Sequence, residues 1–293
     1  MLKALLKAMR PYQWYKNALI FIGIVFSLNL FNFSLWLSVI AAFLIFCALS
    51  GSEYIINDVI DVNKDRRHPA KSKRPIASGR LRISHAVSFA LLMTGVALYG
   101  AYLINLYFFG ISVLFFISTL AYSLWLKRII LVDALMISIN FVIRAVAGSL
   151  AINVAISPWI ILCGLLLALF LIFGKRRHEI ILLGEDAKNH RGILASYNIE
   201  MLEHMTSIVA GALIISYSLY TFLAENLLMM TTIPVVIYGI FRYLLLVHSK
   251  DIGGEPEVIF KDRGMVISII IWIILSLVIL YIVPGNILER FGY

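Results

Sequence analysis

The chain has 293 residues, of which 61% are hydrophobic and only 14% are charged, and its mean hydropathy is +0.94. A soluble domain is about 45–50% apolar and about 25% charged, so a soluble globule of this size could not bury so much apolar surface. This composition excludes a soluble nucleotide-binding enzyme, a disulfide-rich secreted domain and a disordered chain. Because the apolar runs are continuous rather than alternating, they predict an all-α polytopic membrane protein and disfavour a β-barrel.

The net charge of +9 comes from 25 lysines and arginines against 16 acidic residues. The basic residues stand in short blocks between apolar runs, which favours anionic lipid headgroups or a phosphorylated substrate as partners and not nucleic acid. Cys47 and Cys163 lie inside apolar runs and show neither metal-ligand nor disulfide spacing.

Residues 1–11 are expected to form an amphipathic helix that lies on the membrane surface. Its apolar face would carry Leu2, Leu5, Leu6 and Met9, and its basic face Lys3, Lys7 and Arg10. Pro11 then ends this helix before the first membrane span.

A transmembrane helix needs about 20 apolar residues. The predicted spans, nine in all, are 17–33, 35–57, 84–105, 107–125, 130–151, 157–174, 202–224, 228–248 and 265–283. We expect a single integral-membrane domain over 1–293, with its main cytoplasmic loops at 58–83, 175–201 and 249–264.

The distribution of basic residues predicts the orientation. Of the 25 lysines and arginines, 22 fall in the N-terminal segment and in the loops after spans two, four, six and eight. Cytoplasmic loops carry an excess of Lys and Arg, so the N-terminus and these loops are predicted to be cytoplasmic and the C-terminus to lie outside.

A line of acidic residues follows the second span. Asp58, Asp61 and Asp65 are spaced i, i+3, i+7, and Asn57 and Glu53 extend the same helix face backwards. Three carboxylates so close repel one another unless a cation intervenes, and oxygen ligands next to phosphate groups suit Mg²⁺. The basic side chains that follow would bind a polyphosphate; they are Arg66, Arg67, His68, Lys71, Lys73, Arg74 and Arg80.

A second polar line lies in the fifth span, where Asp133, Asn140 and Arg144 are spaced i, i+7, i+11. An arginine at that depth costs at least about 2.5–3.5 kcal/mol if it faces lipid. Arg144 is therefore expected to face a polar cavity and to pair with a carboxylate or a substrate phosphate; a purely structural pair with a carboxylate is the alternative.

The motif Asn57-Asp58-x-x-Asp61-x-x-x-Asp65 resembles that of the UbiA-type intramembrane prenyltransferase superfamily. Two further segments resemble its decaprenyl-phosphate phosphoribosyltransferase branch: Arg10-Pro11-x-Gln13-Trp14-x-Lys16-Asn17 and His68-Pro69-x-Lys71-x-x-Arg74-Pro75. The resemblance implies a UbiA-like helix bundle with a cytoplasmic-side active site.

The resulting hypothesis is a Mg²⁺-dependent transfer of 5-phosphoribose from phosphoribosyl diphosphate to a polyprenyl phosphate. Asp58, Asp61 and Asp65 would bind the metal, with Asp58 and Asp61 catalytic. The substrate-binding residues would be Lys16, Asn57, Lys71, Lys73, Arg74, Tyr122, Lys127, Arg144, Lys175, Arg176 and Glu179. Beyond these substrates the expected partners are membrane lipids, and homo-oligomerisation is left open.

Other interpretations stay open from the sequence. Lys16 fits an interface anchor as well as a phosphate ligand, and Lys175 and Glu179, at i and i+4, fit a surface ion pair. The same aspartates would also serve prenyl transfer from a prenyl diphosphate to an aromatic or other small acceptor. Ordinary superfamily members carry a second Asp-rich motif in the sixth loop, whereas this chain has Lys175-Arg176-Arg177-His178-Glu179, which disfavours that reaction. A transporter of a phosphorylated solute is a third interpretation.

Overall fold

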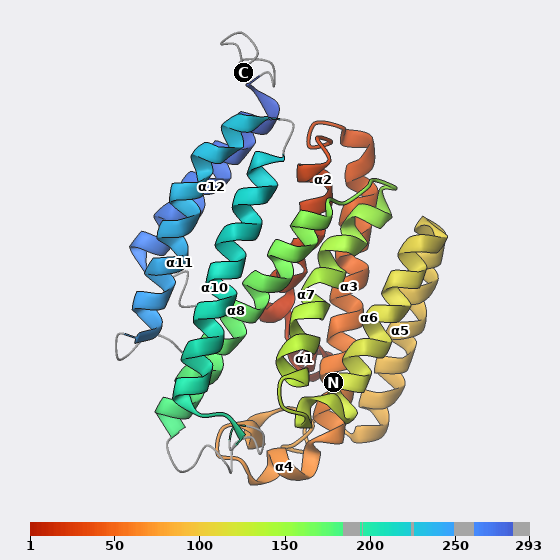
Figure 1. Ribbon diagram of the computed structural model, residues 1–293. Coiled ribbons are helices and arrows are strands. Elements are labelled where there is room, and N and C mark those ends of the chain that lie inside the picture. Colours follow the sequence, from red (N-terminus) through yellow and green to blue (C-terminus); the bar gives the residue numbers. More distant parts are fainter. Residues whose placement is uncertain (184–193, 195, 224–225, 249–260, 284–293) are drawn as a thin grey trace, which may run out of the picture. The chain divides into compact units, whose positions relative to one another are not determined.

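The computed structural model describes residues 1–183, 194, 196–223, 226–248 and 261–283, and every regular element in them is a helix (Figure 1). The chain divides into two compact units. Unit 1 comprises Met1–Lys127 and Ile139–Ile156, and unit 2 comprises Arg128–Ser138 and Ser157–Tyr293. The expectation of a single domain stays a prediction.

Eight helices of the described part are long and apolar enough to cross a membrane. They are α3 (Phe33–Ile60), α5 (Ile83–Ile104), α6 (Leu106–Leu124), α7 (Val132–Ala151), α8 (Pro158–Leu183), α10 (Ile199–Phe222), α11 (Ile233–His248) with the preceding 3₁₀ helix η6 (Leu227–Thr232), and α12 (Arg263–Tyr281). The all-α polytopic class and the second to ninth predicted spans are confirmed. Helix α8 continues nine residues beyond the predicted end at 174, so the first part of the expected loop 175–201 is helical. The expected loop 249–264 lies outside the described residues except for 261–264.

The predicted first span, 17–33, takes a different form. It is a 3₁₀ helix, η1 (Pro11–Phe21), followed by the short helix α2 (Ile22–Phe26). A 3₁₀ helix rises about 2.0 Å per residue and an α-helix about 1.5 Å, so these two segments together extend about 30 Å, the thickness of the hydrocarbon core.

The direction of this segment follows from its two ends. Arg10 contacts Asp58 near the C-terminal end of α3, whereas Asn32 directly precedes the N-terminal end of the same helix. The chain between them therefore runs antiparallel along α3 for most of its length. It is not among the eight helices that are long and apolar enough to cross a membrane, so the predicted first span is not confirmed in the described part of the chain.

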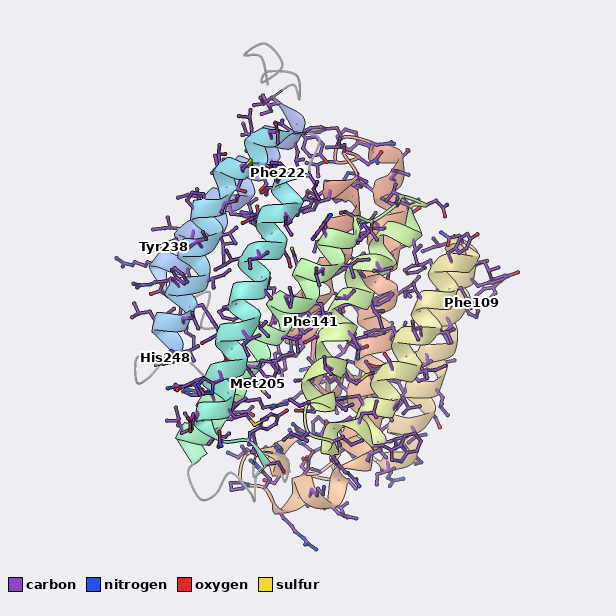
Figure 2. All side chains as sticks on the ribbon, viewed as in Figure 1. Phe109, Phe141, Met205, Phe222, Tyr238 and His248 are labelled. Atoms are coloured by element: carbon purple, nitrogen blue, oxygen red, sulfur yellow. The ribbon has the colours of Figure 1, made fainter. Side chains whose placement is uncertain are left out.

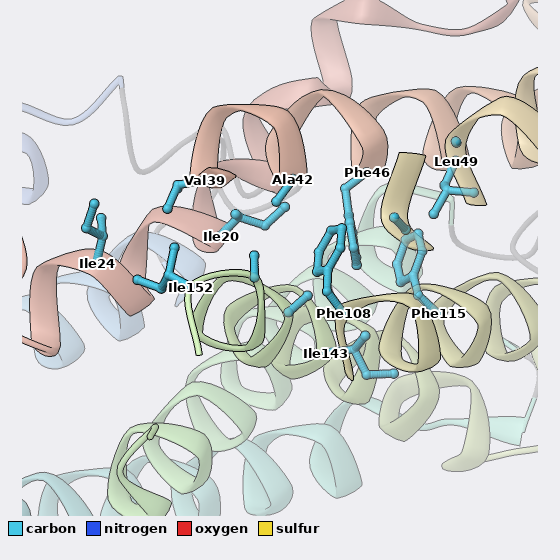
Figure 3. Packing of buried hydrophobic residues seen from close by; sticks show 14 residues of the cluster. Ile20, Ile24, Val39, Ala42, Phe46, Leu49, Phe108, Phe115, Ile143 and Ile152 are labelled. Atoms are coloured by element: carbon cyan, nitrogen blue, oxygen red, sulfur yellow. The ribbon is translucent and has the colours of Figure 1, made fainter. Parts of the chain in front are cut away.

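The core of unit 1 lies between this segment and helices α3, α6 and α7 (Figure 3). Ile20 and Ile24 are fully buried, and the rings of Phe46 and Phe115 pack in a tilted arrangement with their centroids 4.8 Å apart. Lipid tails are as apolar as leucine, so close van der Waals packing rather than burial from water holds such helices together.

The closest approach in this core is made at Gly148 of α7. A Cβ placed there would overlap the carbonyl group of Ile20. The absent side chain lets η1 lie directly against α7, which is how small residues act at helix interfaces in membranes.

The N-terminal helix α1 (Leu2–Ala8) divides its apolar side chains between two environments. Leu5 and Met9 are buried in unit 1, whereas Leu2 and Leu6 are exposed. Part of the expected apolar face thus packs against the protein. The exposed part is suited to contact with a membrane surface.

The packing of unit 2 is formed chiefly by α8, α10, α11 and α12. Phe170 and Tyr243 pack with ring centroids 4.9 Å apart, and Leu213 and Ile240 complete the same cluster. Other large apolar side chains project outward, as Tyr238 of α11 does in Figure 2. In a membrane protein this outward apolar surface faces lipid.

We expect Gly148→Ala to lower the thermal unfolding midpoint of the detergent-solubilised protein, because the added methyl group forces η1 away from α7. Overpacking of this kind costs about 1–3 kcal/mol. Gly95→Ala is the matched control, since a Cβ at Gly95 in α5 meets nothing within 4 Å. An unchanged midpoint for Gly148→Ala would contradict the close contact.

Candidate active site

Two buried aspartates meet where α3 ends and α4 (Val62–Arg67) begins. Asp58 and Asp65 are only 2% and 3% exposed. A guanidinium group lies between them: Nη1 of Arg74 donates to Oδ1 of Asp58 at 3.0 Å and to Oδ2 of Asp65 at 2.7 Å. The chain turns back through the 3₁₀ helix η2 (Lys71–Lys73) and so brings Arg74 onto these carboxylates. A single cation thus relieves the repulsion between two carboxylates.

A second guanidinium group reaches Asp58 from the N-terminal segment. Nη2 of Arg10 lies 2.5 Å from Oδ1 of Asp58, and the Arg10 guanidinium carbon stands 4.8 Å from the centre of the Tyr54 ring. Arg10 has a left-handed backbone, with φ 53° and ψ 63°. A left-handed non-glycine residue costs about 1–3 kcal/mol and persists only where its surroundings hold it, often at functional sites.

The position of Arg10 corrects the expectation that it lies on the outer, basic face of the N-terminal helix. Helix α1 ends at Ala8, and the strained turn before Pro11 directs Arg10 inward. The one sequence signal was the proline, which disfavours a helical conformation in the residue before it.

Asp61 is paired separately. Nζ of Lys127 lies 2.8 Å from Oδ2 of Asp61 and 3.3 Å from Oδ1 of Asn57. Lys127 stands in the 3₁₀ helix η3 (Leu126–Arg128), which directly follows α6. The contact joins residues 66 positions apart, and it brings together three of the residues proposed from the sequence.

The three aspartates therefore do not share one centre. Helix α3 ends at Ile60, so the face that an unbroken helix would give to Asp58, Asp61 and Asp65 is interrupted. In the described part of the chain, no group of three or more His, Cys, Asp or Glu side chains is placed to hold a metal ion. Asp58 and Asp65 do converge on one positive charge, and two carboxylates completed by substrate phosphates and water are a typical Mg²⁺ environment. This pair of carboxylates fits a divalent cation.

Arg144 forms a polar centre deeper in unit 1. Its Nε donates to Oδ1 of Asn17 at 2.8 Å and its Nη1 to the carbonyl oxygen of Asn140 at 2.7 Å. The guanidinium carbon also lies 4.7 Å from the centre of the Phe115 ring, a cation–π contact. No carboxylate forms a salt bridge with Arg144 among the described residues, so its partners are amide oxygens and an aromatic ring. Its expected contact with a substrate phosphate stays a prediction.

A separate buried network lies in unit 2. Nε and Nη2 of Arg176 lie 3.2 and 2.9 Å from Oδ2 of Asp133, and Nη1 lies 2.8 Å from Oε2 of Glu179. Arg176 is 2% exposed and Asp133 is fully buried. Glu179 thus pairs with Arg176, three residues before it in α8, and not with Lys175 as the surface interpretation had it.

Tyr197 completes this network. Its hydroxyl donates to Oδ1 of Asp133 at 2.9 Å and accepts from the backbone N–H of Leu131 at 2.9 Å. Burial raises the pKa of Tyr197 to about 12, and the neighbouring Asp133 charge acts in the same direction. The phenol therefore stays protonated at neutral pH and ties residue 197 to the start of α7.

The remaining proposed residues occupy varied positions. Lys71 and Tyr122 are partly buried, and Lys73 is exposed next to Arg74. Lys16 is partly buried, with its Nζ 5.9 Å from the centre of the Tyr15 ring. Lys175 is partly buried in α8, one residue before Arg176. Their roles in binding stay predictions.

A sequence model of the UbiA prenyltransferase family matches residues 18–261. The chain belongs to this family. A decaprenyl-phosphate phosphoribosyltransferase of Mycolicibacterium smegmatis is 32% identical over 293 residues, which cover 93% of this chain and 91% of the relative. The protein of the same name from Corynebacterium glutamicum is 29% identical over 294 residues, which cover 96% and 87%.

The structure has the fold of UbiA homologues. A UbiA homologue from Archaeoglobus fulgidus bound to GPP and Mg²⁺ matches it with a TM-score of 0.74 at 17% sequence identity, over 95% of this chain and 100% of that one. The expected resemblance to the UbiA superfamily and to its phosphoribosyltransferase branch is confirmed, and the chain is a UbiA-family membrane transferase.

We expect Tyr197→Phe to lower the free energy of unfolding by about 1–3 kcal/mol, because it leaves the N–H of Leu131 and one oxygen of the buried Asp133 without this partner. The thermal midpoint in detergent measures this effect. Tyr99→Phe, at a tyrosine of α5 that is 66% exposed, is the control and should leave the midpoint unchanged. Equal midpoints for the two variants would show that the Tyr197 hydroxyl contributes nothing.

Proposed function

We propose that this UbiA-family enzyme is a Mg²⁺-dependent phosphoribosyltransferase that moves 5-phosphoribose from phosphoribosyl diphosphate to a polyprenyl phosphate. The observation that carries the proposal is the pairing of two buried carboxylates, Asp58 and Asp65, with the guanidinium groups of Arg10 and Arg74. Such a site offers oxygen ligands for a divalent cation and fixed positive charges for phosphate oxygens. Both decaprenyl-phosphate phosphoribosyltransferases match at least 93% of this chain, which supports the same donor and acceptor.

Asp58 and Asp65 would hold the metal, and Asp61, beside Lys127, is the third proposed ligand. A bound divalent cation supplies positive charge that stabilises the departing diphosphate. We propose that the basic side chains near the carboxylates bind phosphate oxygens. These side chains are Lys71, Lys73 and Arg74.

The reaction needs little proton transfer. An anionic oxygen of the polyprenyl phosphate forms a bond to C1 of the ribose, the bond from C1 to the diphosphate oxygen breaks, and its electron pair leaves with the diphosphate. Because the nucleophile is already an anion, no general base is required. The residues contribute chiefly by positioning the two substrates and neutralising their charges.

The other proposed binding residues divide by their surroundings. Lys16, Asn57, Lys127 and Arg144 belong to unit 1, and we assign Lys127 and Arg144 to the phosphate of the lipid acceptor. Tyr122, also in unit 1, is proposed to line the same site. In unit 2, the enclosure of Arg176 by Asp133 and Glu179 supports a positioning role next to Lys175, which we assign to a donor phosphate.

We also infer that the α3–α4 end of unit 1 faces the cytoplasm. Of the 25 lysines and arginines, 22 lie in the N-terminal segment and in the loops assigned to that side. Phosphoribosyl diphosphate is a soluble, highly charged molecule, so a site at the cytoplasmic membrane surface gives it direct access.

The first test is a transfer assay with the purified protein in lipid nanodiscs. Labelled phosphoribosyl diphosphate, decaprenyl phosphate and Mg²⁺ should give a labelled lipid, and chelation with EDTA should abolish its formation. Product from geranyl diphosphate and an aromatic acceptor, without any labelled phosphoribosyl lipid, would instead favour prenyl transfer.

The second test addresses the aspartates. We expect Asp58→Asn to lower kcat/KM at least about 10²-fold, because removing one charged group that stabilises a transition state has effects of about this size. Asparagine is nearly isosteric, so the variant should still elute as folded protein. Glu203→Gln is the control, because Glu203 pairs with Arg177 in unit 2 and has no proposed catalytic role. Full activity of Asp58→Asn would refute the metal assignment.

A further inference from the structure

Glu53 is an unexplained acidic residue in α3. It precedes Asn57 by four residues, so it lies on the same helix face about 6 Å farther from the aspartates along the axis. Its Oε1 is buried and has no hydrogen-bond partner among the described residues. Buried polar atoms are nearly always hydrogen-bonded, and an exception calls for an explanation such as an absent ligand.

Arg144 does not satisfy this oxygen. Arg144 lies within electrostatic range of Glu53. Its Nε donates to Oδ1 of Asn17, and its Nη1 donates to the backbone carbonyl oxygen of Asn140. Oε1 of Glu53 therefore lies near a cation but receives no hydrogen bond from the described residues, although a buried carboxylate oxygen ordinarily needs one.

Tyr54 connects this position to the aspartates. Its ring lies under the guanidinium group of Arg10, the same group that contacts Asp58. Its hydroxyl group forms no hydrogen bond within the described part of the chain, and it lies within electrostatic range of Arg10, Arg144 and Glu53. Polar groups thus continue from Asp58 through Tyr54 to Glu53 and Arg144.

We propose that Glu53 accepts hydrogen bonds from ring hydroxyl groups of the sugar donor and thereby selects a hydroxylated donor over a prenyl diphosphate. This inference rests on the proposed function and assigns to the same site a specificity-determining residue. The ribose of phosphoribosyl diphosphate has vicinal hydroxyls at C2 and C3, and the first is adjacent to the carbon that carries the diphosphate. A diphosphate bound at Asp58 would bring these hydroxyls toward Glu53, which stands five residues earlier in α3, whereas the hydrocarbon of a prenyl donor has no hydrogen to donate.

The test combines enzyme variants with altered donors. kcat/KM is measured for the wild type, Glu53→Ala and Glu53→Gln with phosphoribosyl diphosphate and with its 2-deoxy and 3-deoxy analogues, in nanodiscs containing decaprenyl phosphate. An enzyme whose buried side chain hydrogen-bonds a substrate hydroxyl strongly rejects an analogue that lacks this hydroxyl. The kcat/KM of the wild type should therefore be about 10²-fold or more higher with the natural donor than with at least one analogue.

With the natural donor, Glu53→Ala should lower kcat/KM about 10²-fold. With that analogue, the same substitution should change kcat/KM less than about threefold, because the hydroxyl that Glu53 would bind is already absent. Glu53→Gln keeps an acceptor oxygen and the side-chain shape. It should lose about tenfold with the natural donor and retain wild-type expression and thermal midpoint.

Ser52→Ala is the control, since Ser52 is the preceding residue of α3, is 1% exposed and also has a buried hydroxyl without a partner in the described residues. It should leave the donor preference unchanged. If the wild type is active but Glu53→Gln lowers kcat/KM equally with all three donors, the contact between Glu53 and the sugar is overturned and the proposed function stays intact. A wild type that transfers no phosphoribosyl group would overturn the proposed function and this inference with it.

Discussion

The interaction on which unit 1 depends is the contact of one guanidinium nitrogen, Nη1 of Arg74, with two buried carboxylates. Asp58 and Asp65 are too deeply buried to be stabilised by water, and two adjacent negative charges in such surroundings are strongly unfavourable. Arg74 relieves that repulsion, and Arg10 adds a second positive charge on Asp58. The arrangement keeps oxygen ligands together while leaving cations that can turn to phosphate oxygens.

The path of the N-terminal segment follows from the same requirement. For Arg10 to reach Asp58, residues 11–32 must return along α3 to its far end, and they do so as a 3₁₀ helix followed by a short α-helix. That thin segment packs against α7 because Gly148 has no side chain. Asn17 on this segment in turn accepts a hydrogen bond from Arg144, so the packing that positions Arg10 also positions the deeper polar centre.

Unit 2 shows how a buried arginine is stabilised without solvent. Arg176 has carboxylate partners in Asp133 and Glu179, and Tyr197 supplies a hydrogen bond to the remaining oxygen of Asp133. A buried polar network becomes rigid when its polar atoms have hydrogen-bond partners. The cationic stretch that replaces a second Asp-rich motif is therefore not a uniform basic surface, since Arg176 is held inward by its partners.

Hydropathy, charge distribution and local spacing determined the class of this protein from the sequence, because each depends only on neighbouring residues. They predicted eight of the spanning helices, the acidic motif and the family. The tertiary structure alone decided which charges meet, since Arg10 with Asp58 and Lys127 with Asp61 join positions 48 and 66 residues apart. Such pairs are set by helix packing, which local periodicity does not contain. The break of α3 after Ile60 likewise separated Asp61 from the other two aspartates, although an unbroken helix would have placed all three on one face.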